Sequence, residues 1–219
     1  MRDIHTDSWI LINHIAKKSI VVFDSISKLP EWYRGSPLRL PIAMFSNYYK
    51  LGLIHGGVVE RNSICSIYLG DGGSGKSTSV VKNILDYNQN LLADDYFAYD
   101  YLTGKIFPLY CSIKLKEDNY QTYKKFFSDG VVGSNIPKEK QVINTEKLNL
   151  NLSKGGVLHK IYLPNSTKYI NDSIKTSDVY RAIIPSTLTG LMNHKSISIR
   201  SFSTLAHFKN KSWINWKEI

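Results

Sequence analysis

The chain has 219 residues and a hydrophobic fraction of 42%, so it can bury a core of its own without disulfides or structural metals. Its net charge of +10 comes from basic residues spread along the chain, a pattern more typical of a solvated surface than of a nucleic-acid-binding stripe. Polar residues interrupt the apolar stretches near the N-terminus before these reach signal-peptide or membrane-spanning length. The sequence therefore predicts a cytoplasmic protein without membrane association. Cys65 and Cys111 lie inside apolar runs and are expected to be buried free thiols.

The first 50 residues predict a small β-structure followed by a connector. Residues 8–15 and 19–26 are rich in β-branched residues and are separated by "AKK", which indicates two strands of a hairpin or sheet edge. Residues 29–41 contain three prolines and one glycine and are expected to be a connector. Residues 42–54 have apolar residues at helical spacing and predict a helix that leads to His55.

The middle of the chain alternates between strand and helix patterns. Residues 63–70 predict a buried strand that stops at a glycine, and residues 77–87 predict a helix. Residues 88–95 are expected to be a loop and a very short strand that ends at two aspartates. Residues 96–116 are dense in β-forming residues and predict two strands joined by a turn at "TGK".

The last part of the chain begins with a change in composition. Residues 117–156 are polar and weakly periodic, which indicates an irregular excursion or lid with a short helix in residues 119–127. Strand patterns return in residues 157–164 and 196–202, and residues 175–195 read as mainly helical with a proline interruption.

A phosphate-binding loop is predicted from "GDGGSGKS", which matches G-x-x-x-x-G-K-[ST] and lies between the predicted strand and helix, as this motif requires. Its glycines let the chain adopt positive φ and bring backbone N–H groups to phosphate oxygens, and the helix adds its positive dipole end. Lys76 is expected to hold the β- and γ-phosphates of a purine triphosphate, with ATP favoured, and Ser77 to ligate Mg²⁺. The predicted nucleotide-binding residues are Gly70, Asp71, Gly72, Gly73, Ser74, Gly75, Lys76, Ser77 and Thr78.

Such a loop is used by ATPases, GTPases, kinases and the ATPase subunits of transporters, so the loop alone does not define the reaction. Residues 152–156, "LSKGG", superficially resemble the signature of ABC-transporter ATPases, but no apolar run ending in Asp-Glu follows at the proper distance. The sequence also lacks the Asn-Lys-x-Asp motif with which G-proteins read guanine. Both of these classes are therefore excluded.

Asp94 and Asp95 are candidates for the chemistry beside the loop. Neighbouring side chains on a strand point to opposite faces, so the two carboxylates cannot do the same job. One could face Mg²⁺ near Ser77 while the other acts as general base toward an acceptor hydroxyl, although a turn or cap often explains such a pair. His55 could orient or share a proton with a carboxylate if "GGVVE" pairs with the strand before the loop; a lone histidine is more often structural.

The succession "IHGG", "GDGGSGKST" and "LLADD" resembles the HPr kinase/phosphorylase family and its shorter HPr-kinase-like relatives, whose nucleotide core is similar to that of phosphoenolpyruvate carboxykinase. The match covers residues 51–116. The resemblance implies an α/β fold with a P-loop kinase core of the HPr kinase/PEP carboxykinase type, a mixed β-sheet flanked by helices. It also implies a catalytic role for Lys76, with His55 positioning the base. By that pattern Asp94 is the base, and Asp95 binds the metal together with Ser77.

The chain departs from the full-length regulators of that family. It is too short to include their N-terminal domain, and it lacks their "IRG"-type signature. The resemblance therefore does not extend to phosphorylase activity or to HPr as substrate. The shorter relatives include kinases that phosphorylate a serine of a ribosomally made precursor peptide, and the chain looks more like that group.

A further cation is expected at the γ-phosphate, because negative charge on that group must be offset during transfer. Arg181, on the predicted late helix, is the preferred candidate, and Lys114 is the second. Either side chain has the alternative of lying exposed on the surface.

The sequence as a whole predicts a single kinase domain over residues 1–219. Its parts are N-terminal strands and a connector (1–50), the nucleotide-binding core (51–116), a polar loop or lid (117–156), and C-terminal strands and a helix (157–219). The expected activity is ATP- and Mg²⁺-dependent phosphorylation of a hydroxyl, foremost a serine of a small protein or peptide. There are two alternatives. The first is a kinase whose acceptor is a small hydroxylated metabolite, and the second is a non-catalytic, nucleotide-dependent module that binds nucleic acid or regulates another process. The family resemblance further implies a homo-oligomer, while the acceptor and the ATP or GTP preference stay open.

Overall fold

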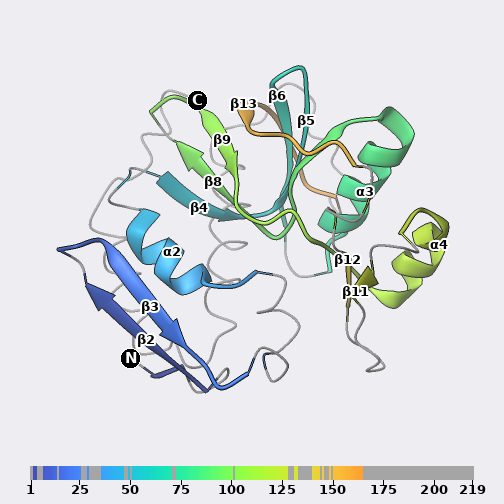
Figure 1. Cartoon of the computed structure of the whole chain (residues 1–219). Coiled ribbons are helices and arrows are strands. Elements are labelled where there is room, and N and C mark those ends of the chain that lie inside the picture. Colours follow the sequence, from blue (N-terminus) through green and yellow to red (C-terminus); the bar gives the residue numbers. More distant parts are fainter. Residues whose placement is uncertain are drawn as a thin grey trace.

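Figure 1 shows the computed structural model of the chain. The structure describes residues 2–3, 7–13, 15–25, 29, 36–46, 49, 51–70, 73–100, 102–127, 131–132, 140–143, 145, 148 and 150–164. Among these residues, no helix combines the length and apolar character needed to cross a membrane.

A seven-stranded mixed sheet forms the centre of the fold, in the order β4-β8-β9-β13-β6-β5-β7. Its strands are β4 (Leu51–His55), β5 (Gly57–Arg61), β6 (Ile64–Tyr68), β7 (Asn90–Ala93), β8 (Tyr96–Asp100), β9 (Lys105–Pro108) and β13 (Gly156–Tyr162). Strand β13 pairs with β6 in parallel, and the other pairs in this sheet are antiparallel. The fold is therefore α/β with a large mixed sheet, as the sequence predicted at this level.

The sheet is buried on both faces because its central strands carry apolar residues at successive positions. In β5, Val58 packs into a cluster on one face with Cys65 and Ile67 of β6. Val59 packs into the cluster on the other face, which includes Val80 of helix α3 (Lys76–Tyr87). The strands therefore join two apolar layers, and α3 covers one of them.

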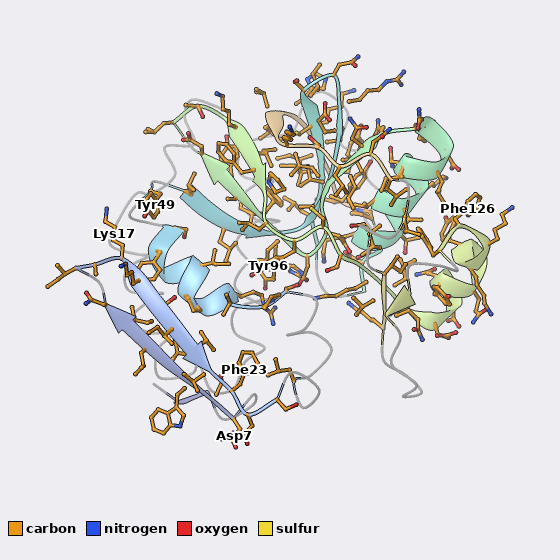
Figure 2. All side chains as sticks on the ribbon, in the orientation of Figure 1. Asp7, Lys17, Phe23, Tyr49, Tyr96 and Phe126 are labelled. Carbon is orange, nitrogen blue, oxygen red and sulfur yellow. The ribbon has the colours of Figure 1, made fainter. Side chains whose placement is uncertain are left out.

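The other helices and the two small sheets lie beside the central sheet (Figure 1). The hairpin of β2 (Ser8–Asn13) and β3 (Lys18–Val22), with β1 (Arg2–Asp3), forms one small sheet, near helix α2 (Arg39–Ser46). Strands β10 (Ile113–Leu115), β12 (Gln141–Ile143) and β11 (Val131–Val132) form the other, next to helix α4 (Glu117–Phe127). In Figure 2, Tyr96 lies near the middle of the molecule, between α2 and the central sheet.

Most predicted elements are confirmed within the described residues. The N-terminal hairpin, the strand before the loop, helix α3, the short strand before the aspartates and the helix in residues 119–127 are all present. The prediction of a helix over residues 42–54 was wrong in its second half: α2 ends at Ser46, and Leu51–His55 is strand β4. A short strand with apolar residues on both faces has a pattern similar to that of a buried helix. Only the pairing of this segment in the central sheet distinguishes strand from helix.

Four further predictions need correction or lie outside the described residues. Helix α2 begins at Arg39, inside the predicted connector of residues 29–41. Residues 96–116 contain a third short strand, β10, besides the two expected. The helix over residues 175–195 and the strand over 196–202 lie outside the described residues.

Both cysteines are free thiols, as predicted. Cys65 is fully buried, and burial raises the pKa of its thiol to about 12, so this thiol stays protonated at neutral pH. Cys111 is only partly buried, which corrects the prediction for its exposure.

Candidate functional site

The glycine-rich loop connects the end of β6 to the start of α3, which is the arrangement that the motif requires. Gly73 and Gly75 have φ of 84° and 93°, in the left-handed region that residues with a Cβ rarely adopt. Gly75 is the N-cap of α3, so the first backbone N–H groups of this helix face the loop. Lys76 Nζ donates a hydrogen bond to the Gly70 carbonyl at 2.6 Å, which folds the side chain along the loop.

The loop fits a phosphate group. Ser74 Oγ is buried, and within the part of the chain that the structure describes it has no hydrogen-bond partner. A buried hydroxyl without a partner is costly, and a phosphate oxygen would satisfy it. A Cβ at Gly70 would lie 2.7 Å from this hydroxyl, so glycine is needed at that position for the loop to close. Backbone donors, one lysine and an unsatisfied hydroxyl are a suitable set of groups for a polyphosphate.

Asp94 lies at the end of β7 and is almost completely buried, with 1% of its surface exposed. Its Oδ2 accepts a hydrogen bond from the Lys114 backbone N–H at 3.1 Å, and its carboxyl is hydrogen-bonded to the Ser77 side chain. Burial raises the pKa of the Asp94 carboxyl, the Lys114 N–H bond lowers it, and the charge of Asp95 raises it again; the net shift is upward. Asp94 therefore faces the start of α3.

Asp95 has different partners, because its backbone turns sharply. It has φ of 89°, and its carbonyl accepts a hydrogen bond from Gly56 N–H at 3.0 Å. Its Oδ1 lies 3.3 Å from His55 Nε2 and its Oδ2 lies 2.9 Å from Lys114 Nζ. Burial alone would raise the pKa of Asp95, but the Lys114 ammonium and His55 outweigh it and hold this pKa well below its ordinary value. A strained backbone at a charged residue is a feature of functional sites.

His55 is held against Asp95 by its place at the end of β4. Strand β4 pairs with β8 so that His55 is opposite Tyr96, and the two rings stack with centroids 4.9 Å apart. Arg39 lies over the same Tyr96 ring, 5.3 Å from its centroid, and its charge also lowers the pKa of Asp95. This packing fixes the orientation of the imidazole toward the carboxylate.

Lys114 links the two aspartates. Its backbone N–H binds Asp94 and its ammonium binds Asp95, and the ammonium also donates to Ser36 Oγ at 2.7 Å. Ser36, in turn, is fully buried and donates its hydroxyl hydrogen to Asp95. The lysine is 6% exposed, so it acts as a fixed internal counter-ion.

These groups share one cavity of about 120 Å³ beside the loop. The loop and α3 form one side of it, and β10 with the start of α4 and of β12 forms the other. Its lining residues are His55, Gly73, Gly75, Lys76, Ser77, Thr78, Asp94, Asp95, Lys114, Leu115, Lys116, Asn119 and Lys140. The cavity thus brings a phosphate-binding loop, two carboxylates, an imidazole and several ammonium groups together.

No protein-family model matches the sequence, and no curated protein matches it. Among solved structures, the chain is similar to the HPr(Ser) kinase/phosphatase from Coxiella burnetii. The sequence identity is 11% and the TM-score 0.33, over 73% of this chain and 96% of that chain.

The cavity contains most of the residues predicted from the sequence. His55, Lys76, Ser77, Thr78, Asp94 and Asp95 all line it, with Gly73 and Gly75. Asp71, Gly72 and Arg181 lie outside the described residues. Lys114, the second choice for a further cation, touches both aspartates.

Several lining or supporting residues are not predicted from the sequence, among them Ser36, Lys116 and Lys140. Ser36 belongs to a segment that was read only as a connector, and its contact with Asp95 spans 59 positions of the chain. Lys116 and Lys140 were counted among the dispersed surface lysines. The alternation of Lys114 and Lys116 around the short strand β10 was an available signal, since it places both on one face.

Proposed function

We propose that the protein is an ATP- and Mg²⁺-dependent kinase of the HPr-kinase-like type, a single domain that transfers the γ-phosphate to a hydroxyl group. The observation that carries this proposal is the pair of adjacent carboxylates with separate partners beside a phosphate-binding loop. Asp94 is bound to the Ser77 side chain, and Asp95 is bound to His55. A carboxylate that an imidazole orients in a cavity beside the loop can take a proton from the group that attacks the γ-phosphate.

The contacts favour a division of labour opposite to the one implied by the family pattern. Ser77 and Asp94 are adjacent oxygen ligands, so we assign Mg²⁺ to this pair; the bound ion would offset phosphate charge. Asp94 is only 1% exposed, so its carboxylate is the less accessible of the two to an acceptor. The Asp95 side chain keeps 16% of its surface exposed and lines the cavity, so we assign it as the general base.

In the transfer step, Asp95 takes the proton of the acceptor hydroxyl. The acceptor oxygen forms a bond to the γ-phosphorus while the bond from this phosphorus to the β–γ bridging oxygen breaks, and ADP leaves with the electron pair. His55 keeps the Asp95 carboxylate oriented through its Nε2 contact, and Lys114 keeps it ionised. Lys76 holds the phosphates on the opposite side of the cavity.

The acceptor is proposed to be a serine of a small protein or precursor peptide. This part of the proposal rests on the resemblance of "IHGG", "GDGGSGKST" and "LLADD" to the short HPr-kinase-like enzymes.

The test compares wild type with Asp95→Asn and Asp94→Asn, using labelled ATP, Mg²⁺ and a panel of serine peptides and hydroxylated metabolites. Asp95→Asn is expected to bind nucleotide normally and to lose transfer by about 10²- to 10⁴-fold. Asp94→Asn is expected to need much more Mg²⁺. Steady ATP hydrolysis by wild type without transfer to any acceptor would overturn the kinase proposal. Transfer by Asp95→Asn at the wild-type rate would overturn the base assignment.

A further inference from the structure

Two lysines of the cavity have no role in the site described so far. Lys116 follows β10 and Lys140 precedes β12, and both side chains line the cavity with the loop while remaining exposed. Among the described residues, no carboxylate lies within ion-pair distance of either ammonium group. Two cations in one cavity that have no counter-ion among the described residues are a reason to look for an anionic ligand.

The strand register brings these lysines together. In the antiparallel pair of β10 and β12, Leu115 is opposite Gln141. Continued by one residue at each side, this register puts Lys116 opposite Lys140. Like charges directly opposite each other are unfavourable across a strand pair. An anion bound between them would turn this repulsion into attraction.

Glu117, next to Lys116 in the chain, does not serve as that anion, and Glu139, next to Lys140, lies outside the described residues. Glu117 accepts hydrogen bonds from the amides of Gln121 and Gln141. These bonds lower the pKa of Glu117 and occupy both of its carboxylate oxygens. Glu117 is thus engaged by amides of α4 and β12.

The position of Lys116 identifies which anion it meets. A Cβ built on Gly73, in the middle of the phosphate-binding loop, would lie 3.2 Å from Lys116 Nζ. The ammonium therefore lies directly over the loop. Asn119 Nδ2 donates to Thr78 Oγ1 at 2.9 Å, which fastens the start of α4 to the start of α3 and keeps the Lys116 segment in place.

We propose that Lys116 and Lys140 form a cationic clamp, from the strand pair opposite the loop, for the terminal phosphate of the bound nucleoside triphosphate. The clamp supplies the cations that offset the charge developing on the γ-phosphoryl group. The inference rests on the proposed function for the identity of the nucleotide. It adds a selection rule, because the two lysine side chains would make the protein bind triphosphates more tightly than diphosphates.

The experiment measures nucleotide affinity directly, by calorimetric titration of the full chain with ATP and with ADP in the presence of Mg²⁺. The test variant is Lys116→Ala/Lys140→Ala, and the matched control is Lys82→Ala/Lys124→Ala, which removes the same charge from exposed lysines that do not line the cavity. The test variant is expected to bind ATP about tenfold or more weakly, with a much smaller change for ADP. The control should leave both affinities unchanged.

Equal weakening for ATP and ADP, or unchanged binding of both, would overturn the clamp; in the second case an acidic acceptor would be the anion that the lysines meet. The Lys116→Arg/Lys140→Arg variant keeps both cations and is expected to restore the preference for ATP. These results do not depend on transfer. A chain that prefers ATP through these lysines but phosphorylates no acceptor would overturn the proposed kinase activity alone. An active kinase whose ATP preference survives Lys116→Ala/Lys140→Ala would overturn the clamp alone.

Discussion

Asp94 and Asp95 are neighbours in the chain, yet their surroundings shift their pKa values in opposite directions. Asp94 is enclosed, and burial is the largest influence on it, so its pKa is raised. Asp95 is ion-paired with Lys114 and contacts His55, so its pKa is lowered. Adjacent titratable groups with opposite shifts are a sign of separate chemical roles. The positive φ of Asp95 produces this separation, because it turns the second carboxyl away from the first.

Asp94→Asn is expected to stabilise the protein without ligands at neutral and higher pH, while damaging its use of Mg²⁺. The raised pKa means that the protonated carboxyl favours the folded state, and that this stability is lost as pH rises through the folded pKa. An asparagine has no such loss and can still accept the Lys114 N–H bond. The melting temperature of the variant should therefore exceed that of wild type by an amount that grows from about pH 4 upward. Asp86→Asn, at an exposed position of α3, is the control.

Lys114→Met is expected to destabilise the protein by about 3 kcal/mol at pH 7, because it leaves the Asp95 carboxylate without its main counter-ion. The pKa of Asp95 is lowered in the folded state, so its stabilising contribution is present above the unfolded pKa and is lost as pH falls through the folded pKa. The difference between variant and wild type should therefore shrink below about pH 4. Urea unfolding at several pH values measures this. Lys82→Met, at an exposed position of α3, should show no such dependence.

At the scale of elements, the site depends on how closely α3 packs against β5 of the central sheet. Gly57, at the start of β5, is in contact with α3, and a Cβ there would lie 2.5 Å from Val80 Cγ2 and 3.4 Å from Asp94 Oδ1. The missing side chain lets the helix that begins at Lys76 approach the strand that ends at Asp94. Close packing of helix and strand thus sets the distance between the phosphate-binding loop and the carboxylates.

Gly57→Ala is expected to cost about 1–3 kcal/mol of stability through overpacking and to move α3 away from Asp94. Val80→Ala should cost about 2 kcal/mol by opening a cavity. In the double variant the alanine methyl can occupy the space that Val80 leaves. Its destabilisation should fall short of the sum of the single effects by at least about 0.5 kcal/mol, measured by denaturant unfolding. Additive effects would show that the two residues do not press on each other.

At the scale of the whole molecule, the site gathers groups from segments far apart in the chain. Ser36 comes from the turn before α2, His55 from β4, the loop from the β6–α3 connection, and Lys114 from β10. The central sheet holds these segments together. Strands β4 and β7 lie at its two edges, and the N–H of Gly56, just after β4, donates a hydrogen bond to the carbonyl of Asp95, just after β7. A ligand in the cavity therefore stabilises the fold as a whole.

Saturating ATP with Mg²⁺ is accordingly expected to raise the melting temperature. At about 100 times its Kd a ligand adds roughly 2.7 kcal/mol, which corresponds to about 5–10 °C for a chain of this size. Lys76→Ala should abolish most of this shift, because the lysine holds the phosphates. Thermal unfolding followed by circular dichroism with ATP, ADP and AMP would measure it. An equal shift with AMP would indicate that the loop does not bind the terminal phosphates.

Local patterns were enough to predict the loop, α3, β7 and the N-terminal hairpin, because each has its own apolar periodicity and is bounded by turn-forming or capping residues. Leu51–His55 was read as helix, since a strand buried in a sheet carries the same apolar density. The contact of His55 with Asp95 could only be stated conditionally, because it depends on which strands pair. Ser36 carried no local signal, and its role comes from packing alone.

The sequence by itself determined the α/β class, the phosphate-binding loop and the presence of two carboxylates behind it, because these features depend on residue type and spacing within a short segment. Only the tertiary structure decided how the carboxylates are shared, with Asp94 beside Ser77 and Asp95 beside His55 and Lys114. It also decided that Lys116 lies over Gly73. The physical reason is that these contacts join distant segments through sheet pairing, and the pairing of strands is fixed by the packing of the whole core.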